Sequence, residues 1–377
     1  MKFLQLLFVT LFVCLAFQNC TKEVTTNIAA PEIWTREKAN EWYKSQPWLV
    51  GSNYITSTAI NQLEMWQAAT FDTVTIEKEF VLAESLGMNT MRVFLHDLLH
   101  QQDSLGFYSR INTFLAIASR HKIKPMFVLF DSVWDPDPNA GKQREPRPFV
   151  HNSGWVQSPG KNALRDTTQY IGLEQYIRGT ILKFRDDNRI LAWDIWNEPD
   201  NINIPAYSSI ELPNKLDYVI PLLKRSFEWA KSAKPQQPLT CGIWTGDWSS
   251  DATMRPIEKL QLELSDVITF HNYNPGADFE LRVQQLQRYG RPIICTEYLA
   301  RPLGSTFQSI LPIGKKYNLA MYNWGFLEGK TQTIYPWDSW TIPYTSEPPL
   351  WFHDIFKKNG TPYKAEETEF IRNIIKG

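Results

Sequence analysis

The sequence of 377 residues has few cysteines and no excess of either charge, and each shortage excludes a class of protein. Its four cysteines form no Cys-x-x-Cys motif, so the zinc and redox sites with that spacing are not expected. The 39 Lys and Arg residues nearly balance 40 Asp and Glu residues, and no long basic run argues for nucleic acid. No Gly-x-Gly-x-x-Gly follows the first predicted strand, which removes the main dinucleotide-binding alternative. We therefore expect no metal, no cofactor and no nucleic-acid partner.

The cysteines also argue against a disulfide framework. Cys14 and Cys20 lie in an N-terminal leader, which leaves Cys241 and Cys295 in the rest of the chain. Both lie in apolar runs that predict strands separated by another strand. We expect two small buried hydrophobic side chains rather than a disulfide.

The N-terminus has the pattern of an export signal. Lys2 precedes an apolar stretch from Phe3 to Phe17, which has the length of a signal-peptide core and is short for a membrane span. Cys20 follows, as in bacterial lipoproteins, so we predict a signal peptide over residues 1–19 and Cys20 as the lipidated mature N-terminus. Residues 17–19 match the usual small-residue cleavage box poorly, so plain secretion is the alternative. The predicted location is the bacterial cell envelope, or else the periplasm or the exterior.

After a tether and short helix over residues 20–45, residues 46–377 are predicted to form one domain. Apolar runs alternate with amphipathic stretches, a pattern typical of a (β/α)8 TIM barrel. The predicted strands are Val50–Ile55, Thr90–Leu95, Pro125–Phe130, Ile190–Trp196, Leu239–Trp244, Val267–His271, Ile293–Glu297 and Ala320–Trp324. The predicted helices are Val74–Leu86, Ile111–His121, Leu173–Phe184, Leu216–Ala233, Ile257–Leu264, Leu281–Tyr289, Phe307–Tyr317, Trp351–Lys357 and Glu366–Ile375.

Aromatic residues are abundant, with 15 Trp, 15 Tyr and 21 Phe, and their placement matters more than their number. Two long connections, Ser132–Asp166 and Leu327–Leu350, follow the third and eighth predicted strands. Both are rich in aromatics, unlike disordered segments, so they predict ordered βα loops on the catalytic face of the barrel. Their tryptophans are candidate platforms for sugar rings, which stack on aromatic faces: Trp134, Trp155, Trp337 and Trp340.

Two glutamates lie at the exits of buried strands. The run Trp193-Asp194-Ile195-Trp196-Asn197-Glu198-Pro199 ends the fourth predicted strand, and Thr296-Glu297-Tyr298 ends the seventh. Barrels of this kind build their active sites at these strand ends. A glycosidic bond needs one carboxyl group that delivers a proton and one carboxylate opposite the developing positive charge, so this pair predicts glycoside hydrolysis.

Other polar and aromatic residues are predicted at the same face. Arg92 could hold a carboxylate ionised, although it could equally pair with the core acid Asp194. Asn197 could bind a sugar hydroxyl, and a hydroxyl and an imidazole from the segment at His271 and Tyr273 could reach the glutamates. Trp324 would form the floor of the pocket. Each of these residues alone would more often be structural, and their joint placement at five strand ends favours a site.

In these positions the chain resembles clan A retaining glycoside hydrolases, particularly family 5, the cellulase and mannanase group. The motifs that carry the resemblance over about residues 48–360 are Arg92, Trp196-Asn197-Glu198-Pro199, His271-Asn272-Tyr273, Thr296-Glu297-Tyr298 and Trp324. The resemblance implies Glu198 as acid/base, Glu297 as nucleophile, Asn197 as ligand of the 2-hydroxyl, Arg92 and Tyr273 as partners of the nucleophile, His271 near the acid/base and Trp324 under the sugar. Many members carry a histidine near the end of the third strand, where this chain has Asp131, which we expect to accept a sugar hydroxyl instead.

One motif competes with this interpretation. His96-Asp97-Leu98-Leu99-His100 has histidines four residues apart, close to the His-Glu-x-x-His pattern of zinc proteases. It has Asp in place of the glutamate base and directly continues a predicted strand, so we expect no zinc there and place His96 and Asp97 at the rim of the cleft.

Three functions remain open. The first is a retaining hydrolase acting on a β-mannan, β-glucan or xylan, with the two carboxyls about 5 to 5.5 Å apart. The second is a cell-surface carbohydrate-binding protein without catalysis, and the third a transglycosylase that uses the same residues. We expect a monomer whose partner is a carbohydrate and whose contact with a membrane is limited to an anchor at Cys20.

Overall fold

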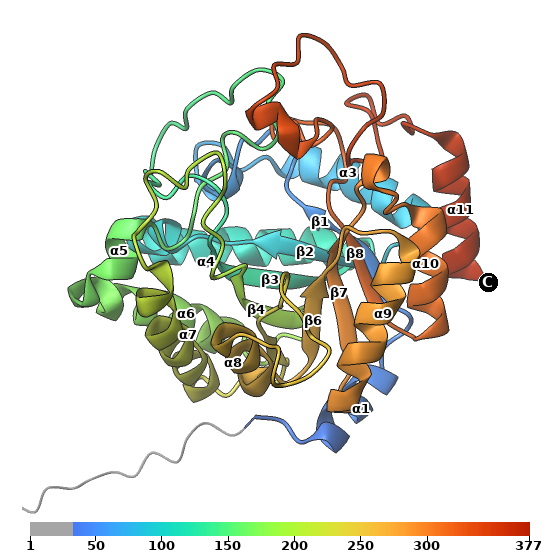
Figure 1. Cartoon of the computed structure of the whole chain (residues 1–377). Helices are drawn as coiled ribbons and strands as arrows, with labels where there is room; N and C mark the ends of the chain where they lie inside the picture. Colours follow the sequence, from blue (N-terminus) through green and yellow to red (C-terminus); the bar gives the residue numbers. More distant parts are fainter. Residues whose placement is uncertain (1–32) are drawn as a thin grey trace, which may run out of the picture.

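The computed structural model describes residues 33–377, which form a barrel of eight parallel strands surrounded by helices (Figure 1). The strands are β1 (Val50–Tyr54), β2 (Thr90–Phe94), β3 (Lys124–Asp131), β4 (Ala192–Asn197), β5 (Leu239–Thr240), β6 (Ile268–His271), β7 (Ile293–Tyr298) and β8 (Ala320–Asn323). They are hydrogen-bonded in the order β5-β4-β3-β2-β1-β8-β7-β6. A parallel bridge between Ile243 and Phe270 brings the two ends of the sheet together. The predicted (β/α)8 barrel is confirmed, and every predicted strand overlaps an observed one.

The helices are α1 (Arg36–Lys44), α2 (Gln62–Trp66), α3 (Thr73–Leu86), α4 (Asp97–Arg120), α5 (Lys161–Arg165), α6 (Tyr170–Phe184), α7 (Lys215–Ser232), α8 (Pro256–Leu264), α9 (Gly276–Leu286), α10 (Phe307–Lys316) and α11 (Ala365–Lys376). Short 3-10 turns lie at Thr167–Gln169, Gln287–Tyr289, Arg301–Leu303 and Trp337–Trp340. Local interactions set the ends of the helices. At the start of α3, the side chain of Asp72 accepts a hydrogen bond from Thr75 N, and Gly87 ends this helix in the left-handed conformation (φ 82°).

One predicted helix is wrong. The segment Trp351–Lys357 is irregular, and it pairs with the chain after β8 through a bridge between Leu327 and Phe356. Every residue from Trp351 to Phe356 is buried. A short run that is buried almost throughout has no exposed polar face, so its period could not distinguish a helix from an extended segment.

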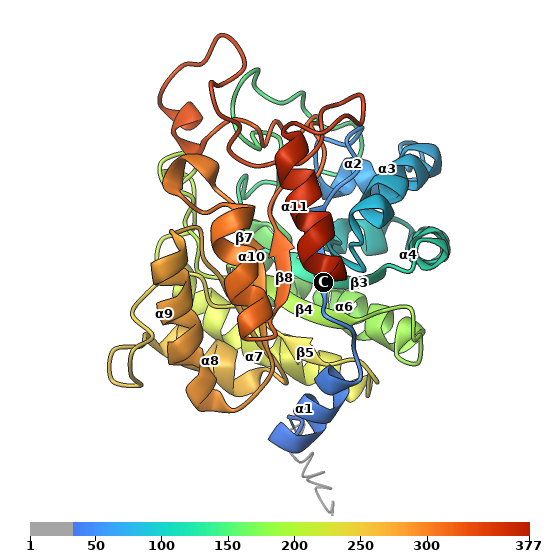
Figure 2. The ribbon, with the colours of Figure 1, turned by 90° about the vertical axis from the view of Figure 1, so that its right-hand side faces the viewer.

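The two ends of the barrel are closed differently. Helix α1 covers the amino-terminal end, where Ala39 and Tyr43 pack with buried residues of the strands, and the Tyr43 hydroxyl donates to Asn318 O at 2.9 Å. Figure 2 shows α1 at the bottom and the long loops at the top. Those loops follow β3 and β8, at the carboxyl ends of the strands, so the polar residues at the strand ends lie beneath them.

Cys241 and Cys295 are free and buried, as predicted. No helix within residues 33–377 is long and apolar enough to cross a membrane. The predicted signal peptide and Cys20 lie outside the described residues.

Candidate active site

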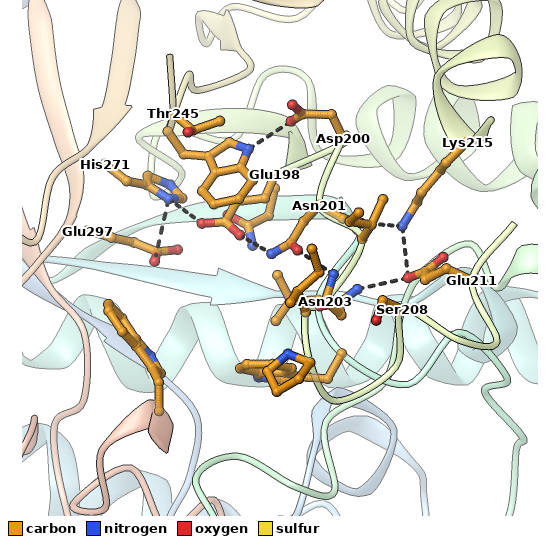
Figure 3. A pocket seen from close by; sticks show the side chains of 18 of the residues that line it. Glu198, Asp200, Asn201, Asn203, Ser208, Glu211, Lys215, Thr245, His271 and Glu297 are labelled. Carbon is orange, nitrogen blue, oxygen red and sulfur yellow. Dashed lines mark hydrogen bonds and ion pairs between the residues drawn. The ribbon is translucent and has the colours of Figure 1, made fainter. Parts of the chain in front are cut away.

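A pocket with a volume of about 1690 Å³ lies at the carboxyl ends of the strands. It is lined from the loops after β3, β4, β5, β6 and β8, and Figure 3 shows polar side chains that line it. Both predicted glutamates face it. One carboxylate oxygen of Glu198 lies within 4.8 Å of one of Glu297, and His271 Nδ1 lies between them, 2.9 Å from Glu198 Oε1 and 3.5 Å from Glu297 Oε2.

The backbone brings these carboxyl groups together. Glu297 lies within β7, and Glu198 directly follows β4 with a left-handed φ of 44°. This conformation turns the chain sharply out of the strand, and such unusual backbone conformations are concentrated at functional sites. Both residues are more than 90% buried, so charge on either is costly unless it is matched.

Glu297 has a cation beside it. Arg92 Nη1 donates to Glu297 Oε1 at 2.8 Å, and the Tyr273 hydroxyl donates to Oε2 at 2.6 Å. Burial raises the pKa of Glu297, while the positive charge of Arg92 and the hydrogen bond from Tyr273 act to lower it. The direct contacts therefore favour the carboxylate form at this position.

Glu198 has only neutral partners in contact. Asn201 Nδ2 donates to Oε2 at 2.7 Å, and Oε1 lies 2.9 Å from His271 Nδ1. Burial raises the pKa of Glu198 to about 7, and the nearby charge of Asp200 adds to this. Burial also lowers the pKa of His271 to about 4, so the imidazole between the glutamates is neutral near pH 7. Glu198 is thus poised to carry a proton, whereas Arg92 and Tyr273 favour charge on Glu297.

Arg92 is fully buried and ties four strands together. It donates from Nε and Nη2 to Asp194 Oδ2, from Nη1 to Asn53 Oδ1, and from Nη2 to Asn197 Oδ1 at 2.7 Å. The two predicted roles of this residue, partner of a catalytic carboxylate and partner of Asp194, are therefore combined in one guanidinium. Asn53 in β1 was not predicted, and its Oδ1 accepts from the same Nη1 that donates to Glu297.

Asp131 and Trp155 lie beneath the pocket rather than on its wall, which corrects two predicted substrate contacts. Asp131 is 1% exposed and accepts from Asn197 Nδ2 at 2.9 Å and Trp155 Nε1 at 2.6 Å. Trp155 is 2% exposed and packs edge-on against Trp324 with ring centroids 6.0 Å apart. The polar atoms of both side chains are bonded to other protein groups. Asp131 orients Asn197 and Trp155 orients Trp324, and both Asn197 and Trp324 line the pocket.

The other predicted aromatic residues reach the pocket. Trp134, Trp324, Trp337 and Trp340 line it and are half-buried. Trp337 packs edge-on against Tyr273 with centroids 5.0 Å apart, and Trp134 lies 5.2 Å from Trp340. Four indole rings thus border the space next to the glutamates.

The loop after β4, residues 198–214, supplies pocket residues that the sequence reasoning missed. Lys215 Nζ donates to Asn201 O at 2.7 Å and to Glu211 Oε1 at 3.1 Å, so it anchors the residue that contacts Glu198 (Figure 3). On the next loop Trp244 Nε1 donates to Asp200 Oδ1 at 2.7 Å. The run of Asp and Asn after the Asn-Glu-Pro motif was the available signal.

Among residues 33–377, Glu198, His271 and Glu297 are the only group of three or more His, Cys, Asp or Glu side chains spaced to share an ion. The hydrogen bonds described above already connect these atoms to one another and to Arg92, whose positive charge an ion would have to face. The competing His96 motif is not such a group. His96 and Asp97 are fully buried at the start of α4 and do not line the pocket, which corrects their predicted place at the rim.

The fold and the lining define the class of protein: a (β/α)8 barrel with a carboxylate pair in an aromatic pocket. Solved structures with the same fold include the exo-β-1,4-mannosidase Op5Man5 from Opitutaceae bacterium strain TAV5, with 20% identity and a TM-score of 0.59 over 87% of this chain and 59% of that chain. An endo-β-1,4-mannanase from Thermotoga petrophila has 15% identity and a TM-score of 0.54 over 89% of this chain and 77% of its own. GH5_18 from Streptomyces cattleya, in complex with GlcNAc, has 11% identity and a TM-score of 0.56 over 88% and 80%.

The chain spans less than two thirds of Op5Man5. No protein-family model matches the sequence, and no curated protein is significantly similar to it. The solved structures with the same fold confirm, at the level of fold, the resemblance inferred from the strand-end motifs.

Proposed function

We propose that the protein is a retaining glycoside hydrolase that cleaves β-glycosidic bonds by double displacement. The observation that carries this is the carboxylate pair, with oxygens within 4.8 Å of each other at the pocket wall. Carboxyl groups about 5 to 5.5 Å apart leave no room for a water between them and the anomeric carbon, and this spacing is typical of retaining enzymes. A non-catalytic binding protein would not need one carboxyl kept neutral and its neighbour kept charged.

In the first step Glu297 attacks the anomeric carbon while Glu198 protonates the leaving oxygen. Arg92 and Tyr273 hold the two oxygens of Glu297 and so direct the attacking carboxylate. In the second step Glu198, now ionised, takes a proton from the water that replaces Glu297 at the anomeric carbon. His271 is neutral where it contacts the glutamates. Its ring nitrogen can therefore keep its hydrogen bond to Glu198 both when Glu198 is protonated and when it is ionised.

For the substrate we propose a β-1,4-linked glycan, with β-mannan first and β-glucan and xylan as alternatives. The support is that the solved structures with the same fold include a β-1,4-mannosidase and a β-1,4-mannanase, together with the four indole rings at the pocket. Aromatic faces stack on the C–H faces of pyranose rings, and pyranoses of all three glycans offer such faces.

The product's configuration tests the mechanism. The purified protein is mixed with an aryl β-glycoside, and the first-formed sugar is followed by proton NMR before it mutarotates. We expect the β-anomer. An α-anomer would refute Glu297 as the nucleophile, and the appearance of longer glycosides in place of free sugar would identify a transglycosylase.

Export and anchoring are further proposals. They rest on the leader sequence and on the Cys20 position, as argued from the sequence. In a bacterial host, labelling with a fatty-acid analogue should mark the wild-type chain and be lost in Cys20→Ala. We also propose a monomer, for which light scattering should give the mass of one chain.

A further inference from the structure

The two long aromatic loops are joined to each other over the barrel. In the β3 loop (residues 132–160), Asn152 N donates to Thr331 O at 2.8 Å and His151 N donates to Ser339 Oγ at 2.9 Å in the β8 loop (residues 324–364). Gln332 of the β8 loop spans the same seam, since its side chain accepts from Phe149 N at 2.7 Å. The ring contact between Trp134 and Trp340 continues this seam to the pocket. We refer to the joined loops as the wall.

The wall packs against the segment that follows β1. Lys330 N donates to Ser57 O at 3.1 Å, and Asn61 Nδ2 donates to Gly154 O at 2.8 Å. The contacts are so close that a Cβ on Gly154 would lie 2.2 Å from Ile60 Cγ2. Accordingly, no residue before Val133 lines the pocket. A sugar chain cannot continue from the glutamates across this side of the barrel.

The other side of the pocket is bordered by exposed residues. Its lining comes from the loops after β4, β5 and β6 and includes Asn201, Trp244, Arg255 and Arg282. Ile204 in the β4 loop is 69% exposed at this pocket, so apolar as well as polar surface is available to further sugars. The pocket is thus bordered by the joined loops on one side and by exposed residues on the other.

The positions of the glutamates decide which end of the substrate meets the wall. Glu198 delivers the proton to the leaving group, and Asn201, Asp200 and Trp244 lie beyond it on the exposed side. Trp337 of the wall packs on Tyr273, which holds Glu297, so the ring that Glu297 attacks lies against the wall. The sugar on the non-reducing side of the broken bond therefore has no room for a neighbour beyond it.

We propose that the enzyme acts from the non-reducing end of its β-glycan and releases one sugar at a time. This inference rests on the proposed function and adds to it the mode of attack. It assigns one closed subsite to the terminal sugar and the exposed side of the pocket to the rest of the chain. The wall then determines specificity for chain ends, because an internal bond could reach the glutamates only if the chain passed through the joined loops.

The test follows products over time. Hexasaccharides of β-1,4-linked mannose, glucose and xylose, each labelled at the reducing end, are incubated with the purified protein, and samples are separated by chromatography. We expect free monosaccharide and labelled pentasaccharide from the first samples, followed by labelled tetrasaccharide. Labelled di- and trisaccharides in the first samples, with little free monosaccharide, would overturn the inference while the proposed hydrolase stands.

A matched substrate gives a second readout. A hexasaccharide whose terminal non-reducing O4 carries a bulky substituent cannot enter a closed subsite, so its hydrolysis should be slower by about 100-fold or more. Equal rates for the capped and uncapped chains would contradict the closed end. If no hexasaccharide and no aryl β-glycoside of the three sugars is hydrolysed at all, the proposed function fails, and the inference fails with it.

Discussion

The ends of β4 and β7 present the same residue type in the same place and give it opposite surroundings. Glu297 at β7 contacts a guanidinium and a phenol, whereas Glu198 at β4 contacts an amide and a neutral imidazole. No Lys or Arg within residues 33–377 forms an ion pair with Glu198. The barrel supplies equivalent positions at its rim, and the partners at each position determine which carboxyl is charged and which holds a proton.

Of the changes that test this contrast between the two glutamates, replacement of Glu297 should have the largest effect. In Glu297→Ala the attacking group is lost, and kcat should fall by at least about 10⁴-fold because no other group of the site can form the glycosyl bond. Added azide should restore turnover of an activated aryl β-glycoside and give the α-glycosyl azide, since the anion attacks from the vacated side. The measurement is product NMR. A β-azide would assign the nucleophile to Glu198 instead.

The matching change at Glu198 should have a smaller and selective effect. Glu198→Ala removes proton delivery, so kcat/KM for a glycan should fall by about 10² to 10⁴-fold. Glycosides of dinitrophenol, whose leaving group needs no proton, should be cleaved to the glycosyl enzyme at near wild-type rate. The readout is a burst of dinitrophenol in stopped flow. Equal losses for both substrates would show that Glu198 does not act as the acid.

The pH profile of the wild type follows from the same contrast. Because the pKa of Glu198 is about 7, kcat/KM should fall as the pH rises through this value and the acid loses its proton. In Glu198→Ala this alkaline limb should disappear, while the limb on the acid side, where Glu297 becomes protonated, remains.

Arg92 is the origin of the asymmetry, and its loss should appear in stability. Arg92→Met leaves Asp194 and Glu297 buried without their cation, which should cost about 3 to 5 kcal/mol of the free energy of unfolding near pH 7. Without the cation the pKa of Glu297 rises further in the folded state, so the loss should shrink when the pH is lowered and this acid becomes neutral. Urea unfolding at pH 7 and pH 5 measures this. Arg92→Lys, which keeps the charge, should be less destabilised, and equal losses at both pH values would contradict the explanation.

Much of this arrangement could be predicted from local pattern. The run from Ile190 to Trp196 is apolar on both faces, as a buried parallel strand must be, and Pro199 ends it, so Glu198 had to lie at a rim. The same reasoning placed Glu297 at β7. Because the carboxyl ends of parallel strands meet at one end of a barrel, the two residues could be brought together without knowledge of any contact.

What could not be predicted depends on how loops fold back. Trp155 has the same sequence setting as Trp134, yet one is buried under the pocket and the other lines it, because the β3 loop crosses over itself at the bridge between Asp135 and Val156. Asp131 is satisfied by donors from α2 and from the same loop, such as Gln62, and this depends on contacts far apart in sequence. The same holds for the wall, since sequence alone indicates long aromatic loops but not their hydrogen bonds to each other.

The smallest expected effect on the difference between the two glutamates comes from Asn201. Its amide donates to Glu198 and so lowers the pKa of that carboxyl. A hydrogen bond to a charged group contributes about 1.5 to 3 kcal/mol, and one pKa unit corresponds to about 1.4 kcal/mol. Asn201→Ala should therefore move the alkaline limb of kcat/KM upward by about one to two units. Asn203→Ala is the control, because Asn203 lies on the same loop and donates to Ser132 O and Glu211 instead. A shift in Asn203→Ala alone would mean that the fold of the loop, rather than the bond from Asn201, tunes the acid.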